Sequence, residues 1–353
     1  MSDLIKQFRE AQSGLVTQQS DFSLSAVVDM IEYNAIDIDP HYQRRDRWKP
    51  EKQSALIESF LMNVPVPPIY FSEDDYGSYS VIDGKQRLTA IKDFLLGNFA
   101  LKSLDRFPVL NGYYFKDLPP PIQNALSVRP YIRVITLLQQ SDPSLKYEVF
   151  LRLNTGGEKL RQQEIRNVAY EGPLNTLLYK LSDSAFLKQQ LKIKSASSTA
   201  YRNMDDLEMV LRFFAISENW EYFGYKLAKG LDLYMANNRF AETEPLEGKF
   251  NRALAACEEI FGERAFQKPL ESGWREQFIA PLYDAQMTAI AQLTTEEIDN
   301  LKSNKEELIS SFRNLYLEDK EFAKSVNQAT SDSSAINTRV SKLISLFRGV
   351  ANG

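Results

Sequence analysis

The sequence predicts an α+β protein with a large α-helical region in its C-terminal half. Short β-branched and aromatic segments alternate with helical patterns up to about residue 170, and the strongest strand pattern is Tyr131–Leu138. From about residue 172 onward, helical periodicity dominates. The chain has 353 residues, of which 43% are hydrophobic, enough for two domains with substantial cores. We therefore expect two domains, residues 1–171 and residues 172–353.

The composition excludes several classes of protein. Cys257 is the only cysteine and His41 the only histidine, which excludes an internal disulfide framework, a cysteine-based zinc site and an HNH-type nuclease site. The net charge of −5 leaves only a local basic groove for nucleic acid. The N-terminus lacks the order of a signal peptide, and no apolar run is long enough to cross a membrane. We expect a cytoplasmic protein with no membrane partner.

The first half of the chain carries the elements of the α+β core. Residues 1–22 are polar and are expected to form a peripheral arm, after which Ser23 or Ser25 can cap a helix. The other elements expected here are a strand at 36–39, a helix at 51–62, strands at 69–71 and 79–82 joined by an acidic turn at 73–78, a helix at 88–96, a hairpin around Asn111-Gly112, a helix at 122–126, a strand at 131–138 and a helix after the Asp142-Pro143 cap.

The second half is read as a helical extension that packs on the core or binds a partner. It contains no glycine-rich phosphate loop, metal-spaced ligand set or catalytic carboxylate pair. The expected helices are 205–216, 227–235, 247–261, 274–293, 296–317 and 338–347.

The segment Tyr79–Thr89 has the pattern of an anion site. A strand is broken by Asp83-Gly84, and a helix then begins, so its N-terminal N–H groups and positive dipole end point toward one place. Lys85 and Arg87 add positive charge there, which suits phosphate. An ordinary strand–turn–helix with solvated charges would give the same pattern, so both interpretations stay open at this point.

Two further segments carry candidate binding residues. Arg44, Arg45, Arg47 and Lys49 stand within six positions, with Tyr42 and Trp48 between and beside them. This cluster could bind phosphate or carboxylate, or be a solvated charge run with Trp48 in the core.

The other segment is the predicted helix after Asn154-Thr-Gly-Gly157. Gln163, Arg166, Asn167 and Tyr170 share one of its faces. Such a face could complete an anion site, but we favour a surface helix that buries Leu160, Ile165 and Val168 instead.

Taken together, three motifs resemble the N-terminal-domain family of GmrSD-type restriction proteins over roughly residues 20–170. The motifs are Tyr42-Gln-Arg with Trp48, Ile82-Asp-Gly-Lys-Gln-Arg-Leu-Thr89, and Phe150-Leu-Arg-Leu-Asn154 followed by Gly157, Leu160, Glu164, Arg166 and Asn167. The resemblance implies a ParB/sulfiredoxin-like fold for this part and a role in restricting modified or phage DNA. Two features depart from the family: Lys85 stands where the family usually has glutamine, and the single histidine leads us to expect that the HNH nuclease domain of larger members is lacking.

The resemblance also implies roles for individual residues. A nucleoside triphosphate would be bound and hydrolysed, with Asp83 and Arg87 catalytic and Asp83 orienting Mg²⁺ or a metal-bound water. The phosphates would be held by Arg44, Arg45, Gly84, Lys85, Gln86, Arg87, Asn154, Arg166 and Asn167.

Three hypotheses for the function follow, and they are compatible with one another. The first is the nucleoside triphosphatase. The second is a non-catalytic DNA-binding or sensor module that contacts DNA through Arg44, Arg45 and Arg47. The third is a regulatory subunit whose helical region binds a separate nuclease or a second copy of the chain.

Overall fold

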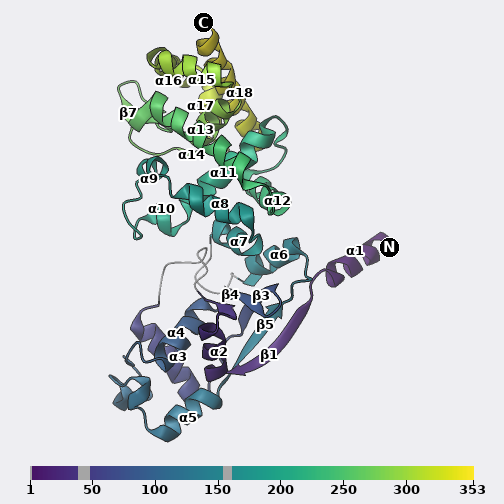
Figure 1. Ribbon diagram of the computed structural model, residues 1–353, viewed down its shortest axis with the longest axis vertical. Coiled ribbons are helices and arrows are strands. Elements are labelled where there is room, and N and C mark those ends of the chain that lie inside the picture. The colour runs from purple at the N-terminus through teal and green to yellow at the C-terminus, as the bar shows by residue number, and fades with distance from the viewer. Residues whose placement is uncertain (1, 39–47, 154–160) are drawn as a thin grey trace. The chain divides into compact units, whose positions relative to one another are not determined.

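The computed structural model describes residues 2–38, 48–153 and 161–353. The chain divides into two compact units, residues 1–169 and residues 170–353 (Figure 1). This division falls two residues before the predicted boundary. The first unit combines a five-stranded sheet with helices and the second is dominated by helices, which confirms the predicted α+β class with a helical C-terminal region.

A mixed five-stranded sheet forms the centre of the first unit. Its strands are β1 (Thr17–Ser23), β2 (Ile36–Asp37), β3 (Ile69–Asp75), β4 (Ser78–Asp83) and β5 (Tyr131–Leu137). The spatial order is β1-β5-β3-β4-β2, and the successive pairs are antiparallel, parallel, antiparallel and parallel. The strongest predicted strand, β5, therefore lies inside the sheet, between β1 and β3.

The prediction of a peripheral arm over residues 1–22 is wrong for its second part, which forms the edge strand β1. Most side chains of β1 are polar and at least partly exposed. Backbone hydrogen bonds to β5 hold it in the sheet, together with the ion pair between Asp21 and Arg133 at 3.0 Å. Such a strand carries no hydrophobic alternation, so the sequence gives no signal for it.

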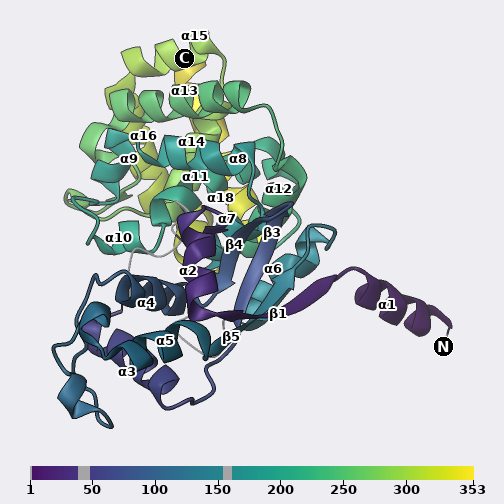
Figure 2. The ribbon, with the colours of Figure 1, turned by 60° about the horizontal axis from the view of Figure 1, so that its bottom comes forward.

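Helices cover both faces of this sheet (Figures 1 and 2). The helices of the first unit are α1 (Ser2–Ser13), α2 (Leu24–Glu32), α3 (Pro50–Leu61), α4 (Lys85–Leu95), α5 (Pro120–Val128), α6 (Pro143–Leu153) and α7 (Gln162–Ala169). Ser23 caps α2 as predicted, accepting a hydrogen bond from the N–H of Ala26. The apolar side chains of α2 to α5 pack against Ile69, Phe71 and Val81 on one face, whereas α6 contacts β4 from the other.

Two predicted connections have a different structure. The hairpin expected around Asn111-Gly112 is wrong, because 3₁₀ helices at Pro108–Leu110 and Phe115–Asp117 flank it instead of strands. The Asn111 side chain accepts a hydrogen bond from the N–H of Leu104, so it folds the loop back on itself. The acidic turn at 73–78 is shorter than predicted, because β3 continues to Asp75.

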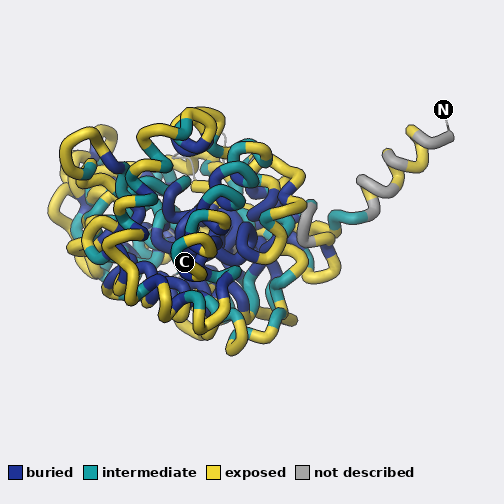
Figure 3. The backbone as a smooth tube through the Cα atoms, turned by 90° about the horizontal axis from the view of Figure 1, so that it is seen from above, coloured by how far each residue is buried: buried dark blue, intermediate teal, exposed yellow. Residues whose placement is uncertain are grey.

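The second unit is built around the buried helix α14 (Ala280–Ala291), which contacts α11 (Asp205–Asn219), α13 (Thr243–Phe261) and α18 (Ser333–Asn352). Buried residues occur on every side of α14, as expected for a core helix. The N-terminal helix α1 of the first unit is, by contrast, exposed where its residues are described (Figure 3). The other helices are α8 (Pro173–Ser182), α9 (Ala185–Gln190), α10 (Thr199–Arg202), α12 (Leu227–Asn238), α15 (Thr295–Ser303), α16 (Lys305–Glu318) and α17 (Lys320–Asn327). In the part of the chain that the structure describes, no helix is long and apolar enough to cross a membrane.

Two of the predicted long helices are wrong in extent. Residues 274–275 form the short strand β7 (Trp274–Arg275), which pairs with β6 (Lys268–Pro269), so α14 begins only at Ala280. The stretch 296–317 is two helices that meet at Asn304, which ends α15 and begins α16. Periodicity continues across this break because both helices bury one side of the same core.

Candidate phosphate-binding turn

The turn between β4 and α4 depends on a glycine that no other residue can easily replace. Gly84 has φ +99°, in the left-handed region, and is the N-cap of α4. A Cβ at this position would lie 2.9 Å from Cγ1 of Ile69. The chain therefore reverses at Gly84 close to β3, and the 11-residue helix α4 begins directly at Lys85.

An irregularity in the β3–β4 pairing lies just before this turn. Phe71 pairs with Val81 and Tyr70 pairs with Asp83, so Ile82 is an extra residue on β4. A bulge of this kind redirects the residues that follow it. It places Asp83 at the end of β4, half-exposed, next to the start of α4.

Arg87 joins the turn to the segment before β3. Its Nη2 donates to Oδ2 of Asp83 at 2.5 Å, and its Nη1 donates to the carbonyl oxygens of Pro67 and Pro68 at 2.5 and 3.0 Å. The Arg87 side chain is only 11% exposed. These contacts give the guanidinium a positioning task, because they fix the orientation of the Asp83 carboxylate. The prediction that Arg87 itself holds phosphate stays a prediction.

Gln86 connects the turn with the end of the basic cluster. Its side-chain oxygen accepts a hydrogen bond of 3.0 Å from the N–H of Trp48. Trp48 is half-buried against the core, and Lys52 Nζ lies 4.4 Å from its ring centroid. Lys85 is the first residue of α4, and its side chain is partly exposed. The predicted ligands Arg44, Arg45, Arg47 and Asn154 lie outside the described residues.

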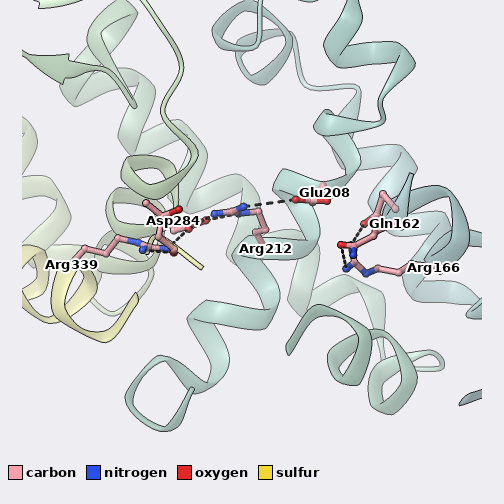
Figure 4. Close-up of polar contacts among 8 residues, drawn as sticks. Gln162, Arg166, Glu208, Arg212, Asp284 and Arg339 are labelled. Atoms are coloured by element: carbon pink, nitrogen blue, oxygen red, sulfur yellow. Dashed lines mark hydrogen bonds and ion pairs between the residues drawn. The ribbon is translucent and has the colours of Figure 1, made fainter. Parts of the chain in front are cut away.

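The polar face of α7 is buried, so the favoured interpretation of a surface helix is wrong. Gln163, Arg166 and Asn167 are at most 1% exposed. Gln163 donates to the side-chain oxygen of Asn167 at 2.8 Å and accepts from Arg166 Nη1 at 3.3 Å. Arg166 Nη2 also donates to Gln162 at 3.4 Å (Figure 4). Gln163 therefore fixes the side chains of Arg166 and Asn167, the two predicted phosphate ligands on this helix.

Lys146 is a polar residue of the same unit that the prediction missed. It is buried, and its Nζ donates to Ser72 Oγ and to the carbonyl oxygen of Glu73, each at 3.3 Å. The sequence does contain a signal, because Lys146 stands four residues before Phe150 and so shares the face of α6 that packs on the sheet. A lysine on such a face must find polar partners inside the fold.

The family of this region follows from a comparison of the sequence with family models. Residues 24–171 match the model described as the GmrSD restriction endonuclease, N-terminal domain. This segment belongs to that domain family. The match contains β2 to β5, the turn at Gly84 and the buried face of α7, and it excludes β1 and nearly all of the helical unit. Searches of curated proteins and of solved structures found no significant match.

Few of the side chains described in this domain could coordinate a metal ion. Among the described residues, no group of three or more histidine, cysteine, aspartate or glutamate side chains is arranged to bind one. Mg²⁺ commonly binds with one or two carboxylates together with substrate phosphates and water. Asp83 fits such a site, because Arg87 takes its Oδ2 while its Oδ1 accepts no hydrogen bond from the described residues.

Proposed function

We propose that the GmrSD-type domain binds a nucleoside triphosphate at the β4–α4 turn and hydrolyses it. The observation that carries this proposal is the geometry of Gly84. Its left-handed backbone and its close approach to Ile69 bring the N-terminus of α4 up to the end of the sheet, and the N-cap residue, being glycine, has no side chain to occupy that position. Helix N-termini of this kind bind phosphate through backbone N–H groups and the helix dipole.

Two side chains of the turn have different roles in this proposal: Lys85 meets the phosphate charge directly, and Asp83 acts through a metal ion or a water molecule. Lys85, in the first turn of α4, would neutralise phosphate oxygens. Asp83, whose carboxylate is held by Arg87, would hold Mg²⁺ or a water molecule beside the phosphates. When bound, Mg²⁺ would neutralise charge on the phosphates.

We further propose that the chain acts in a restriction or phage-defence system, with nuclease activity supplied by a separate polypeptide. The family name supports the first part, since the matched domain is named for a restriction endonuclease. The contact of Gln86 with the backbone of Trp48 supports a link to DNA, because it ties the end of the basic cluster at residues 44–49 to the turn. Arg44, Arg45 and Arg47 would then contact DNA phosphates, and DNA binding would be coupled to nucleotide binding at the turn.

The nucleotide part is tested with full-length protein carrying Lys85→Ala. We expect wild-type protein to bind at least one of ATP, GTP, CTP and UTP in the presence of Mg²⁺, and to release phosphate from it. Loss of one charge-assisted contact should weaken binding by about tenfold or more, which corresponds to about 1.4 kcal/mol. Isothermal titration calorimetry measures the affinity, and a phosphate-release assay measures turnover with and without DNA.

Lys92→Ala is the matched control, because Lys92 is a lysine in the last turn of the same helix and pairs with Glu32 at 2.9 Å. It should bind nucleotide like wild type. Equal affinities for the two variants would remove the turn as the site. Asp83→Ala should abolish phosphate release while nucleotide binding persists, and unchanged turnover in this variant would contradict the catalytic role of Asp83.

A further inference from the structure

The helical unit contains a pocket of about 440 Å³ that the proposed function does not use. Three segments far apart in the sequence form it: the end of α9, the residues after α13, and the chain from β7 toward α14. Its volume lies within the range of about 300–1,000 Å³ that is usual for small-molecule sites. The residues that line it are Gln189, Gln190, Lys192, Glu263, Arg264, Gln267, Trp274, Glu276, Gln277 and Phe278.

Two aromatic rings of the pocket are held rigidly from behind. Trp274 stacks on Phe312, with an interplanar angle of 16° and ring centroids 6.1 Å apart. Phe278 packs against Phe266 and Tyr283, with centroids 5.6 Å away in each case. Both supporting phenylalanines are fully buried. The pocket therefore offers fixed aromatic surface to a planar ligand.

Glutamine side chains provide hydrogen-bonding groups beside these rings. Gln190 is buried and donates to the carbonyl oxygen of Gly262 at 3.4 Å, and Gln267 donates to that of Glu263 at 2.7 Å. The side-chain oxygens of both residues accept no hydrogen bond from the described residues. Gln277 also lines the pocket and is exposed. A ligand with donor and acceptor groups along one edge would satisfy these amides.

Positive charge lies in the same pocket. Lys192 lies two residues after the end of α9, in the left-handed region at φ +56°, and its Nζ donates to the carbonyl oxygen of Glu276 at 2.7 Å. Arg264 is exposed and forms no ion pair with the described residues. Lys268 and Arg275 stand opposite each other in the nearby β6–β7 pair. These cations suit an anionic group attached to the planar ligand, even though Glu263 and Glu276 are also present.

We propose that this pocket binds a single nucleotide of a DNA strand, with the base against Trp274, its polar edge toward the glutamine amides, and its phosphate near Arg264 and Lys192. Amide side chains read base edges, and aromatic rings stack on bases of any sequence. A pocket for one base takes a nucleotide from a single strand or one turned out of a duplex. The site is separate from the β4–α4 turn and does not depend on triphosphate binding there.

The test titrates full-length protein with the four deoxynucleoside 5′-monophosphates and with a short single-stranded DNA oligonucleotide. We expect the oligonucleotide to bind, with a change in tryptophan fluorescence that Trp274→Phe removes while affinity is retained. Arg264→Ala and Gln267→Ala should each weaken the oligonucleotide by about tenfold. Arg252→Ala is the control, since Arg252 is an exposed arginine of the same unit that does not line the pocket.

The outcomes separate this pocket from the turn. Lys85→Ala should bind the oligonucleotide as wild type does, because Lys85 belongs to the other unit. The proposal is overturned if neither the monophosphates nor the oligonucleotide bind, or if Arg264→Ala and Gln267→Ala bind like the Arg252→Ala control. Loss of oligonucleotide binding in Lys85→Ala alone would assign the DNA to the turn and leave this pocket without the proposed ligand.

Discussion

Asp284 is a fully buried carboxylate held by two arginines (Figure 4). Arg212 donates to it from Nε at 2.9 Å and from Nη2 at 2.6 Å, and Arg339 donates from Nη2 at 2.7 Å. Because α14, α11 and α18 each contribute one of these residues, the cluster ties together three helices of the second unit. Glu208 also pairs with Arg212, at 3.7 Å, but it is partly exposed, so Asp284 is the fully buried carboxylate on which both guanidinium groups depend.

Asp284→Asn should therefore destabilise the helical unit by about 3–5 kcal/mol, the usual effect of removing one partner from a buried ionic cluster. Denaturant unfolding followed by circular dichroism measures the loss. Asp299→Asn is the control, because Asp299 is 64% exposed and pairs with Lys302 at 3.7 Å on the surface. Its effect should stay within about 1 kcal/mol. Equal effects of the two substitutions would contradict a structural role for the cluster.

The same cluster makes part of the stability depend on pH. Burial alone would raise the pKa of Asp284, but the charges and hydrogen bonds of Arg212 and Arg339 outweigh it, and the pKa is lowered. A carboxylate whose pKa is lower in the folded than in the unfolded state stabilises the fold at pH values above its unfolded pKa, and that stability is lost as the pH falls below it. The difference in stability between wild type and Asp284→Asn should therefore be constant near neutral pH and shrink below about pH 4.

At the scale of the element, the β4–α4 turn allows one glycine to be compared with another. Gly84 and Gly77 both have positive φ, at +99° and +77°, and both follow strands of the same hairpin. Only Gly84 is crowded: a Cβ would meet Ile69 at 2.9 Å, whereas nothing lies within 4 Å of a Cβ at Gly77. The two positions therefore share a left-handed backbone, which would strain any L-residue placed there, and differ in the steric contact of an added Cβ.

Gly77→Ala should lower stability by about 1–2 kcal/mol, the effect of placing an L-residue in the left-handed region. Gly84→Ala should lower it by about 1–3 kcal/mol more, as expected for overpacking, and should also weaken nucleotide binding by displacing the first turn of α4. Denaturant unfolding and nucleotide titration of both variants provide the comparison. If Gly84→Ala matches Gly77→Ala in both measurements, the close approach to Ile69 does not position the turn.

Individual elements of the first unit differ in how well the sequence predicts them. Ser23 capping α2 and glycine opening α4 are encoded locally, by a residue and its immediate neighbours, and were predicted correctly. The buried face of α7 was misjudged, because glutamine, arginine and asparagine are polar whether solvent or other protein groups satisfy them. The contacts of Arg87 with Pro67 and Pro68 join residues about twenty positions apart, and no local pattern predicts such an arrangement.

At the scale of the whole molecule, the two units differ in how much of their structure can be predicted from local sequence patterns. The longer helices of the helical unit follow from apolar periodicity, with errors at ends and breaks such as Asn304, whereas the shorter helices α8, α9, α10 and α17 were not predicted. The first unit depends on long-range pairing, so β1 was missed although its seven residues all pair with β5. The family match to residues 24–171 stops short of β1 and covers almost none of the helical unit, which leaves the latter to be understood from its own contacts.

Cys257 allows the stability of one unit to be measured separately from the other. It is the only cysteine of the chain and lies fully buried in α13, where burial raises the pKa of its thiol. A thiol reagent can therefore react with native protein only after the helical unit opens. When opening and closing are fast relative to the reaction, the labelling rate reports the free energy of opening of that unit alone.

Asp284→Asn should accelerate the reaction of Cys257 with a disulfide reagent by about two orders of magnitude or more, in line with its loss of about 3–5 kcal/mol. Gly84→Ala, whose effect lies in the sheet-containing unit, should leave the rate unchanged if the two units open independently. The rate of each variant in denaturant provides the reference for a fully accessible thiol. Acceleration by Gly84→Ala in proportion to its own loss of stability would mean instead that the chain unfolds as one cooperative whole, and that damage at the β4–α4 turn is transmitted to the helical unit.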